Sequence, residues 1–230
     1  MKLPLVFSAA LITATLIGGS AFAQFYGAPA TPQYGYGYGA SAAYQPPLAA
    51  EGWTMGVEGG RLFIDDVTQS FKTSLGTVDT RLSFDKGWGV VVQVTYQFSD
   101  GLTLGFSAGY EKAHFGALTG TLAGLTATQD VAGKLSLAPF MANAGYAVPL
   151  SNSLTWNFGG GAGTVRTEAR FEGVADSTVS WDLGFQAFTG LNLTVAPQMI
   201  LNLGYRYTLV KEADLDTQGH LIEAGVTFHF

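Results

Sequence analysis

Apolar and polar residues alternate strictly in the last part of the chain, residues 199–230, which falls into two arms joined by EADLDTQ. In the first arm Leu201 and Leu203 are separated by polar or small residues, and Arg206 lies on the polar side of the pattern. The second arm keeps the alternation up to its aromatic end, Phe230. A period of two over arms of this length predicts a hairpin of two β-strands, each with one apolar face and one small or polar face.

Short and long connections alternate along the rest of the chain, from residue 51 onward. The short ones contain Asp-Gly, proline or asparagine, which favour tight turns, and they cover 99–101, 149–153 and 196–198. Each interval between two of them holds two alternating segments and one longer connection. The longer connections are 65–86, 116–131, 167–178 and 212–218. The pattern therefore predicts eight strands, with tight turns at one end and long loops at the other.

The two faces of these strands differ in size as well as in polarity. One face carries small and polar residues, many of them glycines. The fourth strand, around 134–148, has an unclear phase because Pro139 interrupts it. The other face carries bulky apolar residues, among them Trp53, Met55, Val57, Val90, Val92, Val94, Leu104, Phe106, Phe158, Leu191 and Leu193.

The size difference indicates which face of the sheet lines the interior when the sheet closes into a barrel. In a soluble calycin-type barrel the bulky face would be inside, but eight strands leave room only for a modest filling of side chains or one small ligand. Large side chains on every strand would overfill that space, so we expect the small face inside and the bulky face toward lipid. Because no strand edge can stay unpaired in hydrocarbon, the eighth strand must close on the first. The predicted fold is all-β, an eight-stranded antiparallel up-and-down transmembrane β-barrel.

The composition agrees with a membrane barrel. Only 12% of the 230 residues are charged, whereas soluble domains carry roughly twice that fraction. Beyond residue 23, no stretch reaches the roughly 20 consecutive apolar residues of a membrane helix. The net charge is −6 and the sequence has no basic patch, which argues against a nucleic-acid partner. The absence of cysteine excludes disulfides and lipid attachment through a thiol.

The first fifty residues contain two different segments. Lys2, an apolar run and the small-x-small site Ala21–Ala23 predict a secretory signal peptide over 1–23, with a retained anchor as the alternative. Residues 24–50, rich in Tyr-Gly pairs and proline, predict a disordered low-complexity leader on the periplasmic side. As an alternative, its tyrosines bind glycan or another envelope protein. The barrel then occupies 51–230.

Few ionisable residues point toward the predicted interior. If the terminal hairpin closes symmetrically about residues 214–215, Arg206 lies opposite Glu223, with Glu58 at a similar height and Glu111 also facing inward. We expect a lumenal polar cluster joined by charge-assisted hydrogen bonds, because an unpaired buried charge is costly. The cluster is either a satisfied structural core or a gate in which Arg206 exchanges carboxylate partners and opens a narrow water path.

Large aromatic residues lie near the strand ends. In membrane barrels such residues form a girdle at the interface between lipid and water. We expect an interfacial girdle at the ends that carry the tight turns, formed by Trp53, Trp88, Tyr96, Phe98, Trp156 and Phe230.

The sequence predicts no catalytic, cofactor-binding or metal-binding residue. Its three histidines, His114, His220 and His229, have neither metal-ligand spacing nor a neighbouring nucleophile. The alternative is a hydrolase or acyltransferase at the rim of the barrel, which would use His114 or His220 with a serine of a long loop.

From residue 53 to its end the chain resembles the outer-membrane β-barrel domain family, which includes small porin-like and opacity-type surface antigens and the OmpA-type transmembrane barrels. The resemblance rests on the site Ala21–Ala23, the eight alternating segments and the final VTFHF. It implies a place in the cell outer membrane, in contact with outer-membrane lipid. It also implies that Val226, Phe228 and Phe230 form a signal for the outer-membrane assembly machinery.

The resemblance also implies the range of functions. We expect a monomeric integral outer-membrane protein with a structural or surface-interaction role, whose extracellular loops contact host or environmental ligands and whose lumen is plugged by polar side chains. The alternative is a narrow porin-like channel for small solutes, gated by the cluster of Arg206, Glu223 and Glu58.

Overall fold

The structure of the protein is a computed structural model that describes residues 51–230, except 74–75, 123–124, 173–176 and 213–215. The expected signal peptide and leader fall outside the described residues and stay predictions. Within the described part of the chain, no helix is long and apolar enough to cross a membrane.

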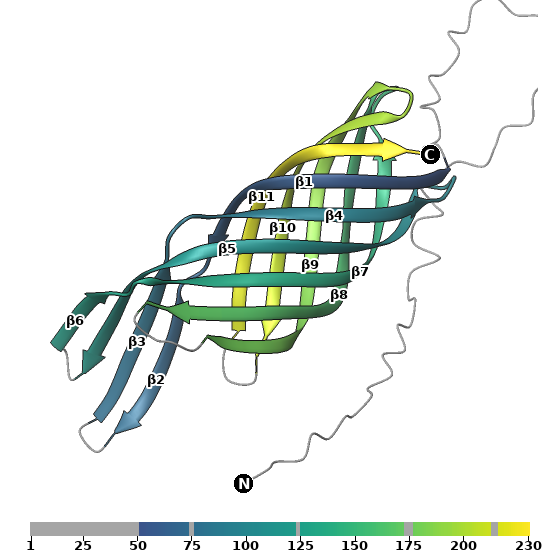
Figure 1. Cartoon of the computed structure of the whole chain (residues 1–230). Coiled ribbons are helices and arrows are strands. Elements are labelled where there is room, and N and C mark those ends of the chain that lie inside the picture. The colour runs from purple at the N-terminus through teal and green to yellow at the C-terminus, as the bar shows by residue number, and fades with distance from the viewer. Residues whose placement is uncertain (1–50, 74–75, 123–124, 173–176, 213–215) are drawn as a thin grey trace, which may run out of the picture. The chain divides into compact units, whose positions relative to one another are not determined.

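Eight strands form a closed antiparallel ring (Figure 1). Consecutive wall strands pair with each other, and β1 pairs with β4 on one side and with β11 on the other. The backbone N–H of Phe230 donates to the Trp53 carbonyl at 2.9 Å, which joins the two ends of the barrel sequence. The predicted fold class is therefore confirmed. The wall strands are β1 (Gly52–Ile64), β4 (Gly87–Gln97), β5 (Leu102–Leu122), β7 (Gly133–Pro149), β8 (Leu154–Phe171), β9 (Thr178–Ala196), β10 (Met199–Lys211) and β11 (Asp216–His229).

The three predicted tight turns lie together at one end of the ring, called the turn end here. The turn between β4 and β5 shows why the sequence closes so tightly. Gly101 has a φ of 92° and its N–H donates to the Phe98 carbonyl at 3.0 Å, a conformation that favours glycine. The Asp100 carboxylate accepts from the N–H of Leu102 at 3.0 Å, as aspartate does in such turns.

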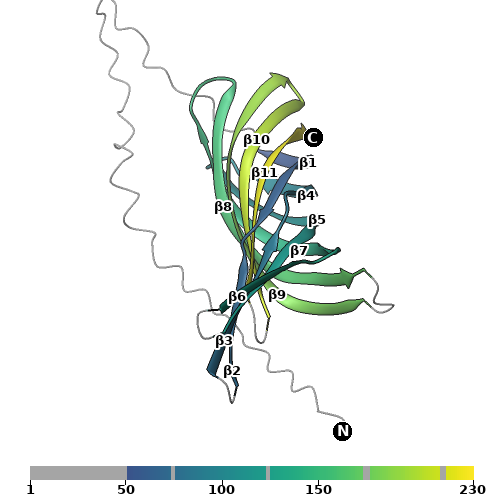
Figure 2. The ribbon, with the colours of Figure 1, turned by 90° about the vertical axis from the view of Figure 1, so that its left-hand side faces the viewer.

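The opposite end, called the loop end, carries additional strands that the sequence analysis placed in loops. β5 continues beyond the ring and pairs with β3 (Gly76–Phe84) and with β6 (Leu125–Asp130). β2 (Val67–Thr73) pairs in turn with β3. The four strands, in the order β2-β3-β5-β6, form the projecting sheet, which extends away from the barrel (Figures 1 and 2). The connections expected at 65–86 and 116–131 are therefore hairpins, not irregular loops.

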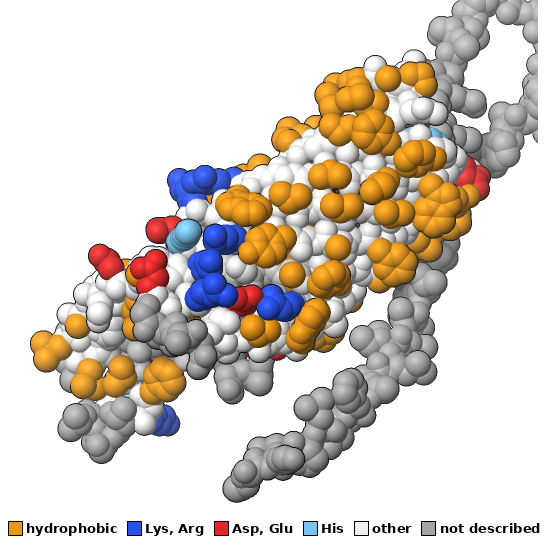
Figure 3. All heavy atoms as spheres, viewed as in Figure 1, with side chains coloured by type: hydrophobic (Ala, Val, Ile, Leu, Met, Phe, Trp, Pro, Cys, Tyr) orange, Lys and Arg blue, Asp and Glu red, His pale blue; other side chains and the backbone are white. Residues whose placement is uncertain are grey.

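The two faces of the barrel wall follow the predicted alternation. Bulky residues point outward: Trp53 is 55% exposed and Phe106 is 71% exposed. Residues one position away, such as Glu58 and Ser107, are buried inside. The apolar outer surface is visible over the ring in Figure 3.

In the fourth wall strand, β7, the structure shows which residues around Pro139 point inward and which point outward. This proline points inward, like Leu137 and Met141, while Phe140 points outward and is 48% exposed. The β5–β7 register is the same on both sides of Pro139, and the ladder is interrupted only at Ala138 and Pro139. A proline has no N–H to donate, which explains the gap.

The loop-end half of the interior differs from the prediction. The sequence analysis expected small and polar residues throughout, but this half is filled by aliphatic side chains. Glycines on facing strands give them space: a Cβ on Gly184 would lie 2.5 Å from Val165 Cγ2 and 2.6 Å from Met141 Cε. Alternating small and large residues is how a narrow barrel accommodates bulk. This apolar core comprises Leu62, Ile64, Val91, Ala113, Phe115, Leu135, Leu137, Met141, Val165, Val210 and Leu221.

Candidate functional site

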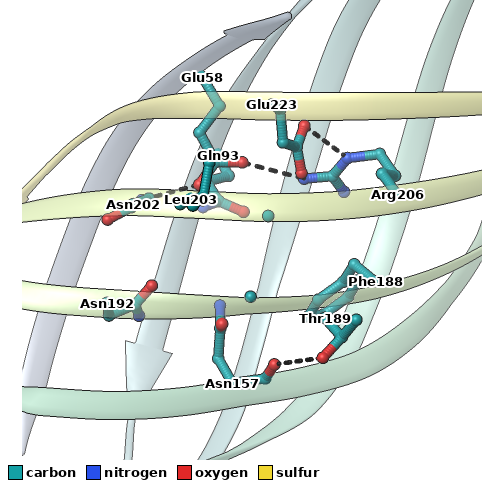
Figure 4. A pocket seen from close by; sticks show the side chains of 12 residues that line it. Glu58, Gln93, Asn157, Phe188, Thr189, Asn192, Asn202, Leu203, Arg206 and Glu223 are labelled. Atoms are coloured by element: carbon teal, nitrogen blue, oxygen red, sulfur yellow. Dashed lines mark hydrogen bonds and ion pairs between the residues drawn. The ribbon is translucent and has the colours of Figure 1, made fainter.

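Arg206 on β10 is the centre of the turn-end half of the lumen, and it is 2% exposed. Its Nε and Nη2 donate to the two carboxylate oxygens of Glu223 on β11, at 3.2 and 3.0 Å. Nη2 also donates to Glu58 on β1 at 3.2 Å, and Nη1 to Gln186 on β9 at 3.3 Å. The paired carboxylate and guanidinium give a bidentate, charge-assisted contact. Figure 4 shows Glu58 and Glu223 on the same side of Arg206.

The Glu58 carboxylate has further donors around it. Gln93 Nε2 on β4 lies 2.9 Å from Glu58 Oε1, and Asn202 Nδ2 on β10 lies 2.7 Å from the same oxygen. Asn202 Nδ2 also lies 2.7 Å from Thr227 Oγ1. These donors replace the hydrogen bonds that water would make to an exposed carboxylate. We call Glu58, Gln93, Gln186, Asn202, Arg206 and Glu223 the polar cluster.

Gln186 connects the cluster to the other side of the barrel. Its amide nitrogen donates to Asn143 Oδ1 on β7 and to Ser107 Oγ on β5, the latter at 3.3 Å. Asn143 in turn donates to Ser107 at 2.9 Å. The ring of Phe188 lies 5.6 Å from the Arg206 guanidinium carbon, within the range of a cation–π contact. The network thus crosses the full width of the lumen.

The register of the terminal hairpin differs from the prediction by two residues. Arg206 lies opposite Leu221, and Glu223 lies opposite Gly204. The expected hairpin centre, Asp214 and Leu215, lies outside the described residues. A shift of two keeps every side chain on its face, because side chains alternate with a period of two. Arg206 therefore still reaches Glu223, but diagonally across the strand pair.

Glu111 does not join the cluster. It is 1% exposed, and neither of its carboxylate oxygens has a hydrogen-bond partner among the described residues. It lies on the loop-end side of the cluster, where the neighbouring positions are Gly89 and Leu221. With all groups ionised, Glu111 and the polar cluster together would hold three carboxylates and one guanidinium. Four neutral buried oxygens, Asn157 Oδ1, Thr167 Oγ1, Asn192 Oδ1 and Asn202 Oδ1, also lack a partner among the described residues. A buried charge without a partner is more costly than a neutral group, so Glu111 differs from them in being ionisable.

A polar cavity of about 70 Å³ lies between the cluster and the turn end. Polar walls of this kind can hold ordered water. On the loop-end side of the cluster, by contrast, the side chains are apolar and tightly packed: Leu62, Val210 and Leu221 are 0–1% exposed. The cavity is lined by Thr54, Thr95, Gln97, Thr103, Asn157 and Asn192, among others.

The expected girdle residues do not all lie at one end. At the turn end the ring of Tyr96 contacts those of Trp53 and Phe98, with centroids 5.2 and 4.9 Å apart. Trp88 lies at the loop end instead, opposite Arg61 and Lys112, so its expected position is wrong. The chain direction explains the error, because β4 begins at the loop end. Trp156 and Phe230 are at the turn end, with 42% and 72% of their surface exposed.

The C-terminal positions Val226, Phe228 and Phe230 lie on the outward face of β11 and just beyond it. Their role as an assembly signal stays a prediction.

The histidines lie apart from one another. His220 has a partner at each ring nitrogen: the Tyr205 hydroxyl lies 2.6 Å from Nδ1, and the Asp65 carboxylate lies 3.3 Å from Nε2. His114 points outward beside Lys134 at the loop end, and His229 lies at the turn end. Among the described residues, no group of three histidines or acids is placed to hold a metal ion.

Several members of the network were not singled out from the sequence. Gln93, Gln186 and Asn202 lie on the inward face, so the alternation could have identified them as partners for buried charges. Asn143 was hidden by the unclear phase of β7. Phe188 is an inward aromatic on a face otherwise small or polar, and no sequence signal marks it.

The comparisons with known proteins agree with this geometry. The family model described as outer membrane protein beta-barrel domain matches residues 10–230. The crystal structure of neisserial surface protein A is similar, with a TM-score of 0.52 and 17% identity over 77% of this chain and 97% of that one. OprG from Pseudomonas aeruginosa has a TM-score of 0.50 and 12% identity, over 78% of this chain and 97% of OprG. No curated protein matches by sequence. At these identities the structural likeness shows the fold.

Proposed function

Because the chain belongs to the outer membrane protein β-barrel family, we propose that it is a surface protein that displays its projecting sheet outside the cell and keeps its lumen closed. In barrels of the outer membrane, short turns face the periplasm and longer loops face outward. The turn end is then periplasmic and the loop end extracellular. Outer-membrane lipid surrounds the apolar face of the wall.

The observation that carries a closed lumen is the presence of two successive barriers of different chemistry. A gate formed by Arg206 alone would open if the guanidinium changed partners. The apolar core would still separate the cluster from the loop end, because Leu62 and Leu221 pair across β1 and β11 with 0 and 1% of their surface exposed. An ion or polar solute would have to be desolvated to pass these residues.

The narrow channel for small solutes is the second candidate, and the polar cavity on the turn-end side of the cluster favours it. It would require the apolar core to rearrange together with the polar cluster. Planar-bilayer recordings of the wild type and Arg206→Ala separate the two functions. A closed structural lumen predicts no conductance steps in either protein. Steps in the wild type, or steps gained in Arg206→Ala, would favour the channel.

Display of the projecting sheet can be tested by cysteine labelling, because the chain has no cysteine of its own. Leu125 on β6 is 80% exposed, so Leu125→Cys should react with a membrane-impermeant maleimide on intact cells. Ser99→Cys, in a turn at the other end, is the matched control and should react only after the outer membrane is permeabilised. The reverse pattern would contradict the proposed orientation.

The projecting sheet is suited to contact another molecule. Phe71 and Leu118 lie on the same face and are 49% and 42% exposed. Exposed apolar residues grouped on one face commonly mark interaction sites. The proposal therefore includes the binding of a host or environmental ligand by the loops. A rim enzyme has less support, since both ring nitrogens of His220 already have partners.

A further inference from the structure

The outward face of the barrel carries a group of cations at the loop end. Their sequence neighbours Leu62, Glu111 and Leu135 are buried inside the ring. Since side chains alternate across a strand, the cations themselves point outward. We call this group the basic collar, and it comprises Arg61 on β1, Lys112 on β5, Lys134 on β7, and Arg166 and Arg170 on β8.

The strand register brings these residues together although they are scattered along the sequence. Arg61 and Lys112 lie on either side of Trp88 in one row across β1, β4 and β5. Lys134 lies directly opposite Arg170. Figure 3 shows Lys and Arg side chains gathered between the apolar surface of the barrel and the projecting sheet. The absence of a basic patch inferred from the sequence is thus wrong for the folded surface.

Negative partners are too few to neutralise the collar. Glu168 lies 3.0 Å from Arg166 and 2.9 Å from Arg170. The other three cations, Arg61, Lys112 and Lys134, have no ion pair within the described part of the chain. The excess of positive charge is local, since the whole chain has a net charge of −6.

The collar covers one side of the barrel. On β9 the outward residues at this level are Val179 and Trp181, which are 45% and 62% exposed. On β10 the outward cation Lys211 is paired with Asp216. The collar therefore marks a particular sector of the wall, which runs from β1 through β4, β5 and β7 to β8.

An apolar groove lies on the outer wall of the same sector, with a volume of about 530 Å³. Small outward residues, Ala142 and Ala162, form its floor, and the larger Phe106 and Phe140 rise beside them. The groove also includes Thr164, which lies two residues from Arg166 on β8. Two residues along a strand correspond to roughly 7 Å, so the groove begins directly next to the collar, on its turn-end side.

We propose that the collar and the groove together bind a phosphate-bearing lipid of the outer leaflet. The cations would contact the phosphate groups, and an acyl chain would lie between Phe106 and Phe140. Arginine and lysine match phosphate oxygens in charge and hydrogen bonding. The position of the collar at the edge of the apolar band favours a lipid over a free anion, because only a lipid occupies both parts. The paired rings of Trp88 and Tyr110, 5.7 Å apart, lie at the same boundary.

The test measures lipid retained by the folded barrel. The full chain is folded into phosphatidylcholine vesicles containing diphosphoryl lipid A, extracted in mild detergent and analysed by native mass spectrometry. We expect the wild type to retain lipid A over phosphatidylcholine, and to retain monophosphoryl lipid A less well. Lys112→Gln with Arg166→Gln should weaken retention by about tenfold, since each basic residue near an anionic lipid contributes substantially to binding.

Two further variants decide whether the lipid is bound in the groove. Ala142→Leu fills the groove without changing charge and should also lower retention. Lys211→Gln removes a cation outside the collar and should leave retention unchanged. Heat-modified gel migration verifies that each variant is folded. Equal retention in all variants would overturn the proposal, as would a loss in Lys211→Gln equal to that of the collar variant. A loss in the collar variant alone would also overturn it, because that result would indicate charge attraction without an acyl site.

Discussion

Arg206 and its partners lie in the turn-end half of the lumen, whereas Leu62, Val91 and Leu221 fill the loop-end half. The polar half depends on specific pairing: each donor of Arg206 needs an acceptor that comes from another strand. The apolar half depends on shape, with glycines such as Gly184 facing bulky side chains. A polar network becomes costly when one partner is lost, because the remaining charges are buried. An apolar core loses stability in proportion to the volume removed. The two halves should therefore respond differently to substitution.

The largest expected effect is the loss of the central cation. Arg206→Ala leaves Glu58 and Glu223 buried without their counter-charge, so we expect the free energy of unfolding to fall by about 3–5 kcal/mol. Denaturant titration of the barrel in lipid vesicles measures it. The triple variant with Glu58→Gln and Glu223→Gln should recover much of this loss, because it removes the stranded charges. A triple variant less stable than Arg206→Ala would contradict the pairing argument.

A smaller loss is expected in the apolar half. Leu221→Ala creates a cavity at a residue that is 1% exposed, which should lower the free energy of unfolding by about 2–4 kcal/mol. The adjacent Ile222 points outward and is 53% exposed, so Ile222→Ala is the matched control and should cost less. If the control cost as much as Leu221→Ala, the two faces would not differ as described.

The fold was largely predictable from the sequence because each strand repeats the same two-residue alternation. The faces and the closure follow from that repetition, and the three tight turns follow from their Asp-Gly, proline and asparagine residues. The projecting sheet was not predictable in the same way, because β5 continues through residues 116–122 without any change in the pattern that marks the barrel's edge.

The candidate site was predictable in its chemistry but not in its register. Arg206 and Glu223 could be placed on one face, and a shift of two residues leaves both on that face. The exact pairing depends on the loop between β10 and β11, whose centre carries no strong turn signal. The apolar core was missed because Leu62, Leu137 and Leu221 interrupt the small and polar pattern only near the loop end. Whether a leucine fits inside depends on the glycine facing it from another strand, which a single sequence does not reveal.

Glu111 offers a test at the boundary between the two halves. Its carboxylate has no partner among the described residues and lies beside the apolar side chain of Leu221. Glu111→Leu removes the cost of burying it, and we expect a gain of about 1–2 kcal/mol in the free energy of unfolding. Glu223→Leu is the contrasting variant: it removes a carboxylate that Arg206 uses and should destabilise the barrel. A loss of stability in Glu111→Leu would indicate that this carboxylate has a partner or a role that the unpaired geometry does not explain.

The smallest expected effect concerns Glu212, which lies between β10 and β11 at the loop end, outside the membrane-spanning part. Burial, followed by the nearby charge of Asp182, raises the pKa of Glu212 above its ordinary value. A raised pKa means that the folded protein binds a proton more readily than the unfolded chain. The contribution of Glu212 to stability should therefore fall as the pH rises from the unfolded-state pKa of about 4.3 through the raised folded-state value.

Titration of stability with pH measures this contribution. Acidification through that window should stabilise the wild type relative to Glu212→Gln, by less than about 0.5 kcal/mol because the side chain is only partly buried and solvent screens its charge. Asp182→Asn removes the repulsion and should reduce the difference between wild type and Glu212→Gln. A difference of the opposite sign, with the wild type gaining stability as the pH rises, would mean that a positive charge and not burial dominates at Glu212. An ion pair would then close the loop end. In that case the contrast between a polar half held by paired charges and an apolar half would not extend to the opening of the barrel at the loop end.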